Sequence, residues 1–158
     1  MSDYARGKGL SSAVTYADPN TAFRWLEAAF GFEPLLVILD ENDQIAHSEM
    51  TFGSGLIMVG SEWSENHRSP KNLSGKNTQS VHVQLAAGED IDAHCAHARQ
   101  SGAEILQEPG DQFYGDRTYR ARDPEGHIWT FGVTVNQLSP AEWDKASGGS
   151  LKTRERLD

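Results

Sequence analysis

The chain has 158 residues, of which 37% are hydrophobic, enough to bury one core but too few for two large independent ones. It carries 23 acidic residues against 14 lysines and arginines, and the formal charge of −9 disfavours binding to nucleic acid or to anionic membranes. No apolar run reaches the length of a membrane span, and the opening residues MSDYARGKGL lack the apolar segment of a secretory signal. We therefore expect a cytoplasmic protein with no nucleic acid and no membrane among its partners.

The first part of the chain is typical of a strand, a helix and three further strands. Residues 11–16 alternate like a half-buried strand. A helix is predicted over 19–30, because Asp18 is a good N-cap and Gly31 stands where a C′ glycine would. Three more strands are predicted, separated by the turns DENDQ and GSG, over residues 34–39, 45–52 and 56–60.

The second part repeats this order. A strand is predicted over 80–85, a helix over about 90–101, and further strands at EIL, RTYRAR and HIWTFG. Glycines recur at a constant spacing between the two halves, because Gly31 and Gly102 are 71 positions apart, as are Gly55 and Gly126. We predict an α+β fold of two pseudo-symmetric βαβββ modules. The expected organisation is module 10–61, linker 62–78, module 79–133 and tail 134–158, with a short helix that Ser139 caps.

Strand alternation predicts which side chains face the helix of each module and which face a cleft between the paired sheets. In the first module, Ala46, Ser48, Met50 and Phe52 are expected on the helix side, and His47, Glu49 and Thr51 on the cleft side. In the second module the helix side receives Val81, Val83, Leu85, Tyr119 and Ala121. Its cleft side receives Ser80, His82, Gln84, Thr118, Arg120 and Arg122, and the apolar lining of the cleft is Leu56, Met58 and Ile128.

Three titratable residues are expected on the cleft side, namely His47, Glu49 and His82. Two imidazoles and a carboxylate are able to hold a divalent metal, and the same side chains also suit the polar floor of an organic-ligand pocket. By contrast, His94 and His97 are expected on a solvated helix face, and Cys95 as a buried structural thiol. Phe113 and Tyr114 precede a predicted strand, where they either cap a ligand or cover a sheet edge.

Four segments carry a resemblance to a known family. DPNTAFRWLEAAFGFE, IAHSEMTFGSGLIMVGS, AGEDIDAHCAHARQSGAEIL and DQFYGDRTYRARDPEGHIWTFG resemble the glyoxalase, bleomycin-resistance and extradiol-dioxygenase superfamily, also called the vicinal oxygen chelate fold. The resemblance runs from about Leu10 to Val133 and implies a pair of βαβββ modules. It also implies a homodimer.

The resemblance also indicates where metal-using members of the superfamily place their ligands. Transferred by strand register, these positions are Ser11, Met58, Ser80 and Thr130, with His82 replacing Ser80 if the strand is shifted by two residues. None of the four is a good ligand for a divalent cation, which needs carboxylate, imidazole or thiolate donors. We therefore expect neither a metal nor another cofactor.

The favoured hypothesis is a glyoxalase-like protein that binds a small organic molecule without a metal; the sequence does not decide whether it transforms that molecule. The residues expected to contact the ligand are His47, Glu49, Met58, His82, Gln84, Tyr114, Arg120 and Thr130. Two alternatives stay open. One is a metal-dependent lyase, isomerase or dioxygenase that uses His47, Glu49 and His82. The other is a bleomycin-type resistance protein that sequesters a drug.

Overall fold

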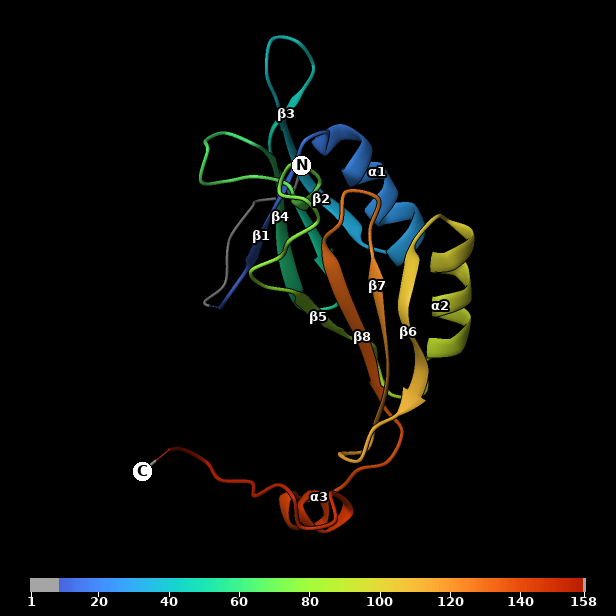
Figure 1. Cartoon of the computed structure of the whole chain (residues 1–158). Helices are drawn as coiled ribbons and strands as arrows, with labels where there is room; N and C mark the ends of the chain where they lie inside the picture. The colour runs from blue at the N-terminus through green and yellow to red at the C-terminus, as the bar shows by residue number, and fades with distance from the viewer. Residues whose placement is uncertain (1–8, 158) are drawn as a thin grey trace. The chain divides into compact units, whose positions relative to one another are not determined.

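Within residues 9–157, which the computed structural model describes, eight strands form two four-stranded sheets. The chain divides into two units, and each unit contains one of the sheets (Figure 1). The first unit extends through Lys76, and the second begins at Asn77.

The first unit runs in the order strand, helix and three strands. Its elements are β1 (Ser12–Tyr16), α1 (Pro19–Phe30), β2 (Glu33–Leu39), β3 (Ile45–Phe52) and β4 (Gly55–Ser61), followed by a 3₁₀ turn, η1 (Pro70–Asn72). The strands lie in the order β1-β4-β3-β2, with β1 parallel to β4 and the other pairs antiparallel. β2 is therefore an edge strand of its sheet.

The second unit repeats this arrangement. Its elements are β5 (Val81–Gln84), α2 (Ile91–Gln100), β6 (Glu104–Asp111), β7 (Asp116–Arg122), β8 (Ile128–Thr134) and α3 (Pro140–Ala146). The strand order is β5-β8-β7-β6, which corresponds strand for strand to that of the first sheet. The predicted α+β fold of two βαβββ modules is confirmed.

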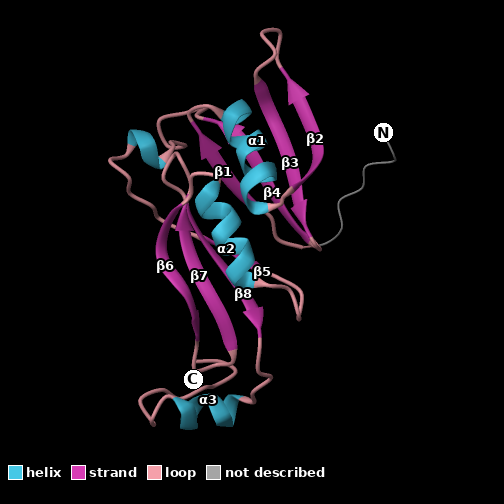
Figure 2. Cartoon of the chain, turned by 90° about the vertical axis from the view of Figure 1, so that its right-hand side faces the viewer, coloured by secondary structure: helices cyan, strands magenta, loops and turns pink. Residues whose placement is uncertain are grey.

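Each of the helices α1 and α2 packs on one face of the sheet in its own unit (Figure 2). α1 buries Leu26 and Phe30, and the strands of its sheet contribute Val14, Met50 and Val59 to the same core. The core of the second unit contains Cys95 of α2 and three fully buried rings from the sheet, those of Tyr119, Trp129 and Phe131. We call the sheet face opposite the helix the open face of each sheet.

The helix ends follow the local chemistry that the sequence predicts. The carboxylate of Asp18 accepts a hydrogen bond of 3.0 Å from the backbone N–H of Thr21, and this contact holds the pKa of Asp18 below its usual value. α1 ends at Gly31, whose φ of 81° is the left-handed conformation that favours glycine. Ser139 caps α3 in a capping box with Glu142.

No helix of the described residues is both long and apolar enough to cross a membrane.

One prediction of side-chain direction in β3 is wrong. Ala46 was expected on the helix side, but its side chain is exposed and Ile45 is buried instead. The reason is an irregularity in the pairing with β2: Ile38 pairs with His47, but the next residue, Leu39, pairs with Ile45. The extra residue in β3 reverses the alternation on that side of the bulge.

A single buried carboxylate organises the hairpin between β7 and β8. One oxygen of Asp123 accepts hydrogen bonds from the backbone N–H groups of Glu125, Gly126 and His127, at 3.0, 2.9 and 3.0 Å. Its other oxygen accepts the indole N–H of Trp129 at 3.0 Å. Asp123 is only 4% exposed, so these donors replace the water that the carboxylate loses on folding.

The expectation that His94 lies on a solvated helix face is wrong. His94 is partly buried, and its Nδ1 shares a hydrogen bond of 2.6 Å with the hydroxyl of Tyr119, a residue with no exposed surface. Tyr119 stacks on Phe131 with ring centroids 5.1 Å apart. Burial raises the pKa of the Tyr119 hydroxyl above its ordinary value. His94 therefore satisfies a polar group of the core.

The raised pKa of Tyr119 predicts a loss of stability at alkaline pH. The folded protein keeps this tyrosine neutral, whereas the unfolded chain ionises it above about pH 10, so its stabilising contribution is complete below that pH and is lost as pH rises toward the folded pKa. For one tyrosine the loss is about 1.4 kcal/mol at pH 11. Tyr119→Phe removes this contribution. Urea unfolding of the variant should show lower stability than wild type at pH 8 and a smaller gap at pH 11.

The matched control is Tyr114→Phe, because Tyr114 lies exposed in a turn. This variant should lose stability with pH as steeply as wild type does. An equally steep alkaline loss in Tyr119→Phe would contradict the assignment.

Candidate functional site

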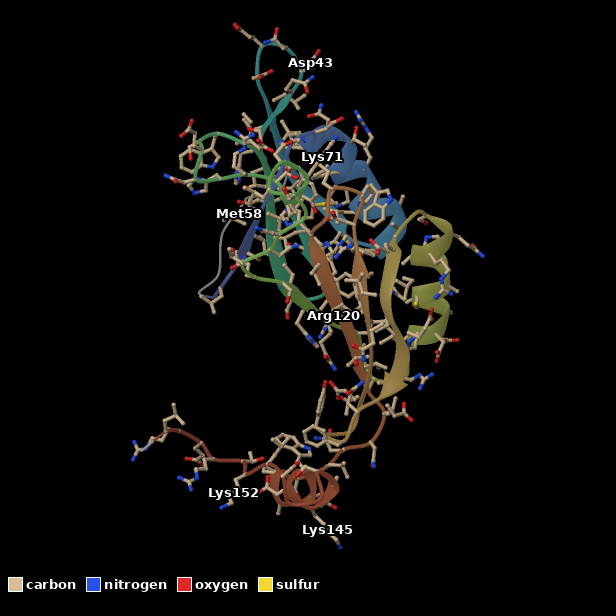
Figure 3. All side chains as sticks on the ribbon, viewed as in Figure 1. Asp43, Met58, Lys71, Arg120, Lys145 and Lys152 are labelled. Atoms are coloured by element: carbon tan, nitrogen blue, oxygen red, sulfur yellow. The ribbon has the colours of Figure 1, made fainter. Side chains whose placement is uncertain are left out.

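The open face of the first sheet combines a buried carboxylate with apolar side chains. Glu49 of β3 pairs in register with Met58 of β4 and with Leu36 of β2, so the three side chains form one row across the sheet. His47 follows on the same face, two residues from Glu49 on the strand. Figure 3 shows Met58 on the side of the sheet that faces away from α1.

His47 and Glu49 are directly hydrogen-bonded. The Nε2 atom of His47 lies 3.0 Å from a carboxylate oxygen of Glu49. The side chain of Glu49 has no exposed surface, while that of His47 is 34% exposed. A buried carboxylate is costly without donors, and the imidazole N–H supplies one. The pair thus places a negative group under a partly accessible imidazole.

A polar row crosses the open face of the second sheet. His82 of β5 pairs with Thr130 of β8, and Thr130 pairs with Arg120 of β7. The guanidinium Nε of Arg120 donates to the hydroxyl of Thr130 at 3.3 Å. Figure 3 shows Arg120 on the side of the sheet away from α2, as the alternation with the buried Tyr119 requires.

A chain of hydrogen bonds continues from this row. Gln84 donates its amide N–H to Asp116 at 3.2 Å and to the hydroxyl of Thr134 at 3.4 Å, which leaves its carbonyl oxygen to accept from His82 Nε2 at 2.9 Å. Thr134 in turn donates to Asp116 at 2.8 Å. The arrangement requires a hydrogen on Nε2 of His82.

Gly132 leaves the room that this chain of hydrogen bonds needs. A Cβ at this position would lie 3.1 Å from the side-chain oxygen of Gln84 and 3.3 Å from Cε1 of His82. Both side chains therefore lean over the backbone of β8 at a residue without a side chain.

Asp116, Gly132 and Thr134 were not among the predicted site residues. The signal for Thr134 was present, because it continues the alternation of Ile128 and Thr130.

Tyr114 lies outside the polar row. It belongs to the turn between β6 and β7, where its ring packs edge-on against Phe113 with centroids 5.3 Å apart. Both rings remain partly exposed. The next residue, Gly115, has a φ of 100°, and its backbone approaches Asn136 too closely for a side chain. The turn therefore presents two aromatic rings at the end of β7.

The segment after β4 has a local structure built on one acid. Glu62 forms an ion pair with Arg68 at 2.7 Å and accepts from the side chain of Asn72 at 2.6 Å. Trp63, which is 71% exposed, stacks on His67 with ring centroids 3.9 Å apart. This part of the predicted linker therefore holds an exposed aromatic pair in a defined conformation.

The pairing of the outer strands corrects the register of the positions that the family resemblance indicated. Ala13, not Ser11, lies beside Met58, and His82, not Ser80, lies beside Thr130. Ser11 and Ser80 precede the strands β1 and β5. The second correction is the shift by two residues that the sequence had left open.

These positions do not suit a divalent metal. The four positions carry a methyl group, a thioether, a hydroxyl and an imidazole. Only the imidazole, that of His82, is a strong donor to a divalent metal. Of the alternative set, His47 and Glu49 belong to the first unit and His82 to the second. In the part of the chain that the structure describes, no three His, Cys, Asp or Glu side chains are grouped to hold a metal ion.

Comparison with known families gives one match that covers most of the chain. Residues 11–131 match the sequence model of the Glyoxalase/Bleomycin resistance protein/Dioxygenase superfamily. The uncharacterized protein Mb0911c of Mycobacterium bovis is 23% identical over 137 residues, which cover 84% of this chain and 88% of that protein.

Solved structures of similar proteins cover the same region. TioX from Micromonospora sp. ML1 is 30% identical with a TM-score of 0.62, over 81% of this chain and 99% of TioX. TnmS3, an antibiotic binding protein from Streptomyces sp. CB03234, has a TM-score of 0.58 at 16% identity, over 84% of this chain and 99% of that chain. At this low identity the likeness to TnmS3 concerns the fold alone.

The contact between His47 and Glu49 predicts a measurable coupling energy. His47→Ala removes a donor from a fully buried carboxylate and should lower the free energy of unfolding by about 2 kcal/mol at pH 7. Glu49→Gln removes the charge that needs the donor. In a double-mutant cycle measured by urea unfolding, the double variant should therefore lose about 1 kcal/mol less stability than the sum of the losses in the two single variants. Strictly additive losses would show that the contact contributes nothing.

Proposed function

The chain belongs to the Glyoxalase/Bleomycin resistance protein/Dioxygenase superfamily, and we propose that it binds a small organic molecule on the open faces of its sheets without a divalent metal. The observation that carries this proposal is the chemistry of those faces. Each open face sets hydrogen-bonding groups next to apolar side chains, which is the composition of pockets for organic ligands.

On the first sheet, the pair of His47 and Glu49 supplies the polar part. Met58 and Leu36 flank the carboxylate in the same row, and Leu56 follows on β4. A ligand that lies over this row meets a thioether and aliphatic carbons, with the partly exposed imidazole as its polar contact. Such a surface suits a planar organic group better than a hydrated ion.

The absence of a metal from the proposal rests on the donor set. Met58, Thr130 and Ala13 offer no carboxylate, imidazole or thiolate, so His82 would be alone among these positions. The Nε2 atom of His47 and one carboxylate oxygen of Glu49 already share a hydrogen bond. A divalent cation bound to both of these atoms would have to replace this hydrogen bond.

We also propose that the protein is a homodimer. The edge strand β2 carries the apolar run from Leu35 to Leu39, and four of its five side chains are between 42% and 49% exposed. An exposed apolar edge strand pairs readily with another chain. A second copy would cover this edge, and the mass of the protein in solution reports on it.

One set of measurements tests the binding proposal. Ligand-observed NMR with neutral, cationic and anionic aromatic fragments should detect binding to metal-free protein. His82→Ala should weaken the binding of fragments that it contacts by about 1 to 3 kcal/mol. Glu49→Ala should weaken binding indirectly, because it removes the hydrogen-bond partner of the His47 imidazole. The control is His97→Ala, on the exposed side of α2, which should leave all affinities unchanged.

Two results would contradict the proposal. One is a protein that binds no fragment of any charge. The other is wild-type protein, purified without chelator, that contains stoichiometric zinc, nickel, manganese or iron and loses it on replacement of His47 or His82. That second result would favour the metal-dependent alternative, in which the metal site has moved rather than disappeared.

A further inference from the structure

We propose that the open face of the second sheet binds the carboxylate of an organic acid, with the Arg120 guanidinium as the anchoring group and the Thr130 hydroxyl beside it. This inference rests on the proposed function and assigns the chemical class of the ligand. It starts from a difference among the three arginines of β7, which are Arg117, Arg120 and Arg122.

Two of these arginines are neutralised within the protein. Arg117 donates to Asp92 at 2.9 Å and to Asp111 at 2.9 Å. Arg122 donates to Glu104 at 2.9 Å. Arg120, which lies between them in sequence, forms no ion pair with any acid of the described residues, and its contact is with the neutral hydroxyl of Thr130. The chain has 23 acidic residues for 14 basic ones, so a shortage of acids does not explain this.

The contact with Thr130 orients the guanidinium for a ligand. Arg120 uses its Nε to donate to Thr130, so the two terminal nitrogens remain available to bind the two oxygens of a carboxylate as a fork. The hydroxyl of Thr130 accepts this bond and keeps its own hydrogen for donation. The arrangement thus offers donors to an anion from two neighbouring strands, held in register by the pairing of β7 and β8.

The neighbouring side chains indicate what the rest of the ligand is. Ile128, two residues before Thr130 on β8, lies on the same face and is partly exposed. It offers apolar contact to a hydrocarbon or aromatic group. On the other side, His82 leans over Gly132 toward Gln84, so its Nε2 hydrogen is engaged. A molecule with an apolar body and one acidic group fits this order of side chains.

The charge of the site favours a carboxylate over a phosphate. A single guanidinium matches one negative charge, and the neighbouring Arg122 is already paired with Glu104. Asp116 lies at the far end of the hydrogen-bond chain through Gln84 and adds negative charge to this face. A dianion would require a second free cation, and the described residues of this row do not provide one.

The experiment compares acids with their uncharged amides. Benzoate, 2-naphthoate and indole-3-acetate, each with its amide, are titrated by ligand-observed NMR and calorimetry up to about 10 mM, a range that covers weak binding. Wild-type protein should bind at least one acid about tenfold more tightly than its amide. Arg120→Gln should abolish this preference, because it removes the charged fork.

Three further variants separate a specific contact from general electrostatics. Arg99→Gln removes the same charge from α2, on the opposite face, and should preserve the preference for the acid. Arg120→Lys keeps the charge without the fork and should retain part of it. Thr130→Val should weaken acid binding about threefold, an effect smaller than that of Arg120→Gln. Circular dichroism confirms that each variant is folded.

The outcomes distinguish this inference from the proposed function. If neutral or cationic fragments bind and none of the acids binds better than its amide, the proposed function stands and the assignment of the ligand class is wrong. If Arg99→Gln and Arg120→Gln weaken acid binding equally, the effect is one of net charge and the assignment is also wrong. Failure of every fragment, charged or not, contradicts both.

Discussion

The buried carboxylate of Asp123 is the contact on which the second sheet depends. It gathers three backbone N–H groups of the turn and the indole N–H of Trp129, so the same side chain closes the hairpin and fixes a large ring in the core. Once the turn is fixed, the antiparallel register of β7 and β8 follows, and Arg120 lies opposite Thr130. A shift of one residue would send Arg120 to the side of α2 and Tyr119 to the open face. The polar row is therefore a consequence of the turn chemistry.

The two open faces differ in character although the units repeat one topology. On the first sheet a carboxylate is buried among aliphatic and thioether groups and is balanced by an imidazole from its own strand. On the second sheet a guanidinium without an acid partner among the described residues lies beside a hydroxyl. The four positions that the family resemblance indicated for a metal contain a single strong donor, the imidazole of His82. The repeated scaffold therefore leaves the chemistry to a few side chains on each face.

Much of this arrangement could be predicted from alternation and turn residues. The sequence predicted His82, Gln84 and Arg120 opposite the buried Tyr119, because two-residue periodicity needs only local information. Three features needed contacts that are distant in sequence. The bulge that exposes Ala46 depends on how β2 pairs with β3. The choice of His82 over Ser80 depends on the parallel pairing of β5 with β8. The burial of His94 depends on Tyr119, 25 residues away.

The most direct test of the account is to locate a bound organic acid by NMR on protein whose resonances have been assigned. With 2-naphthoate, the backbone and side-chain resonances of His82, Arg120, Ile128 and Thr130 should shift together, and those of the exposed side of α2 should not. Nuclear Overhauser contacts should connect the naphthalene ring with the methyl groups of Ile128. Shifts confined to the edge strand β2, to the exposed Trp63 or to α2 would contradict the claim that the open face of the second sheet is a binding surface.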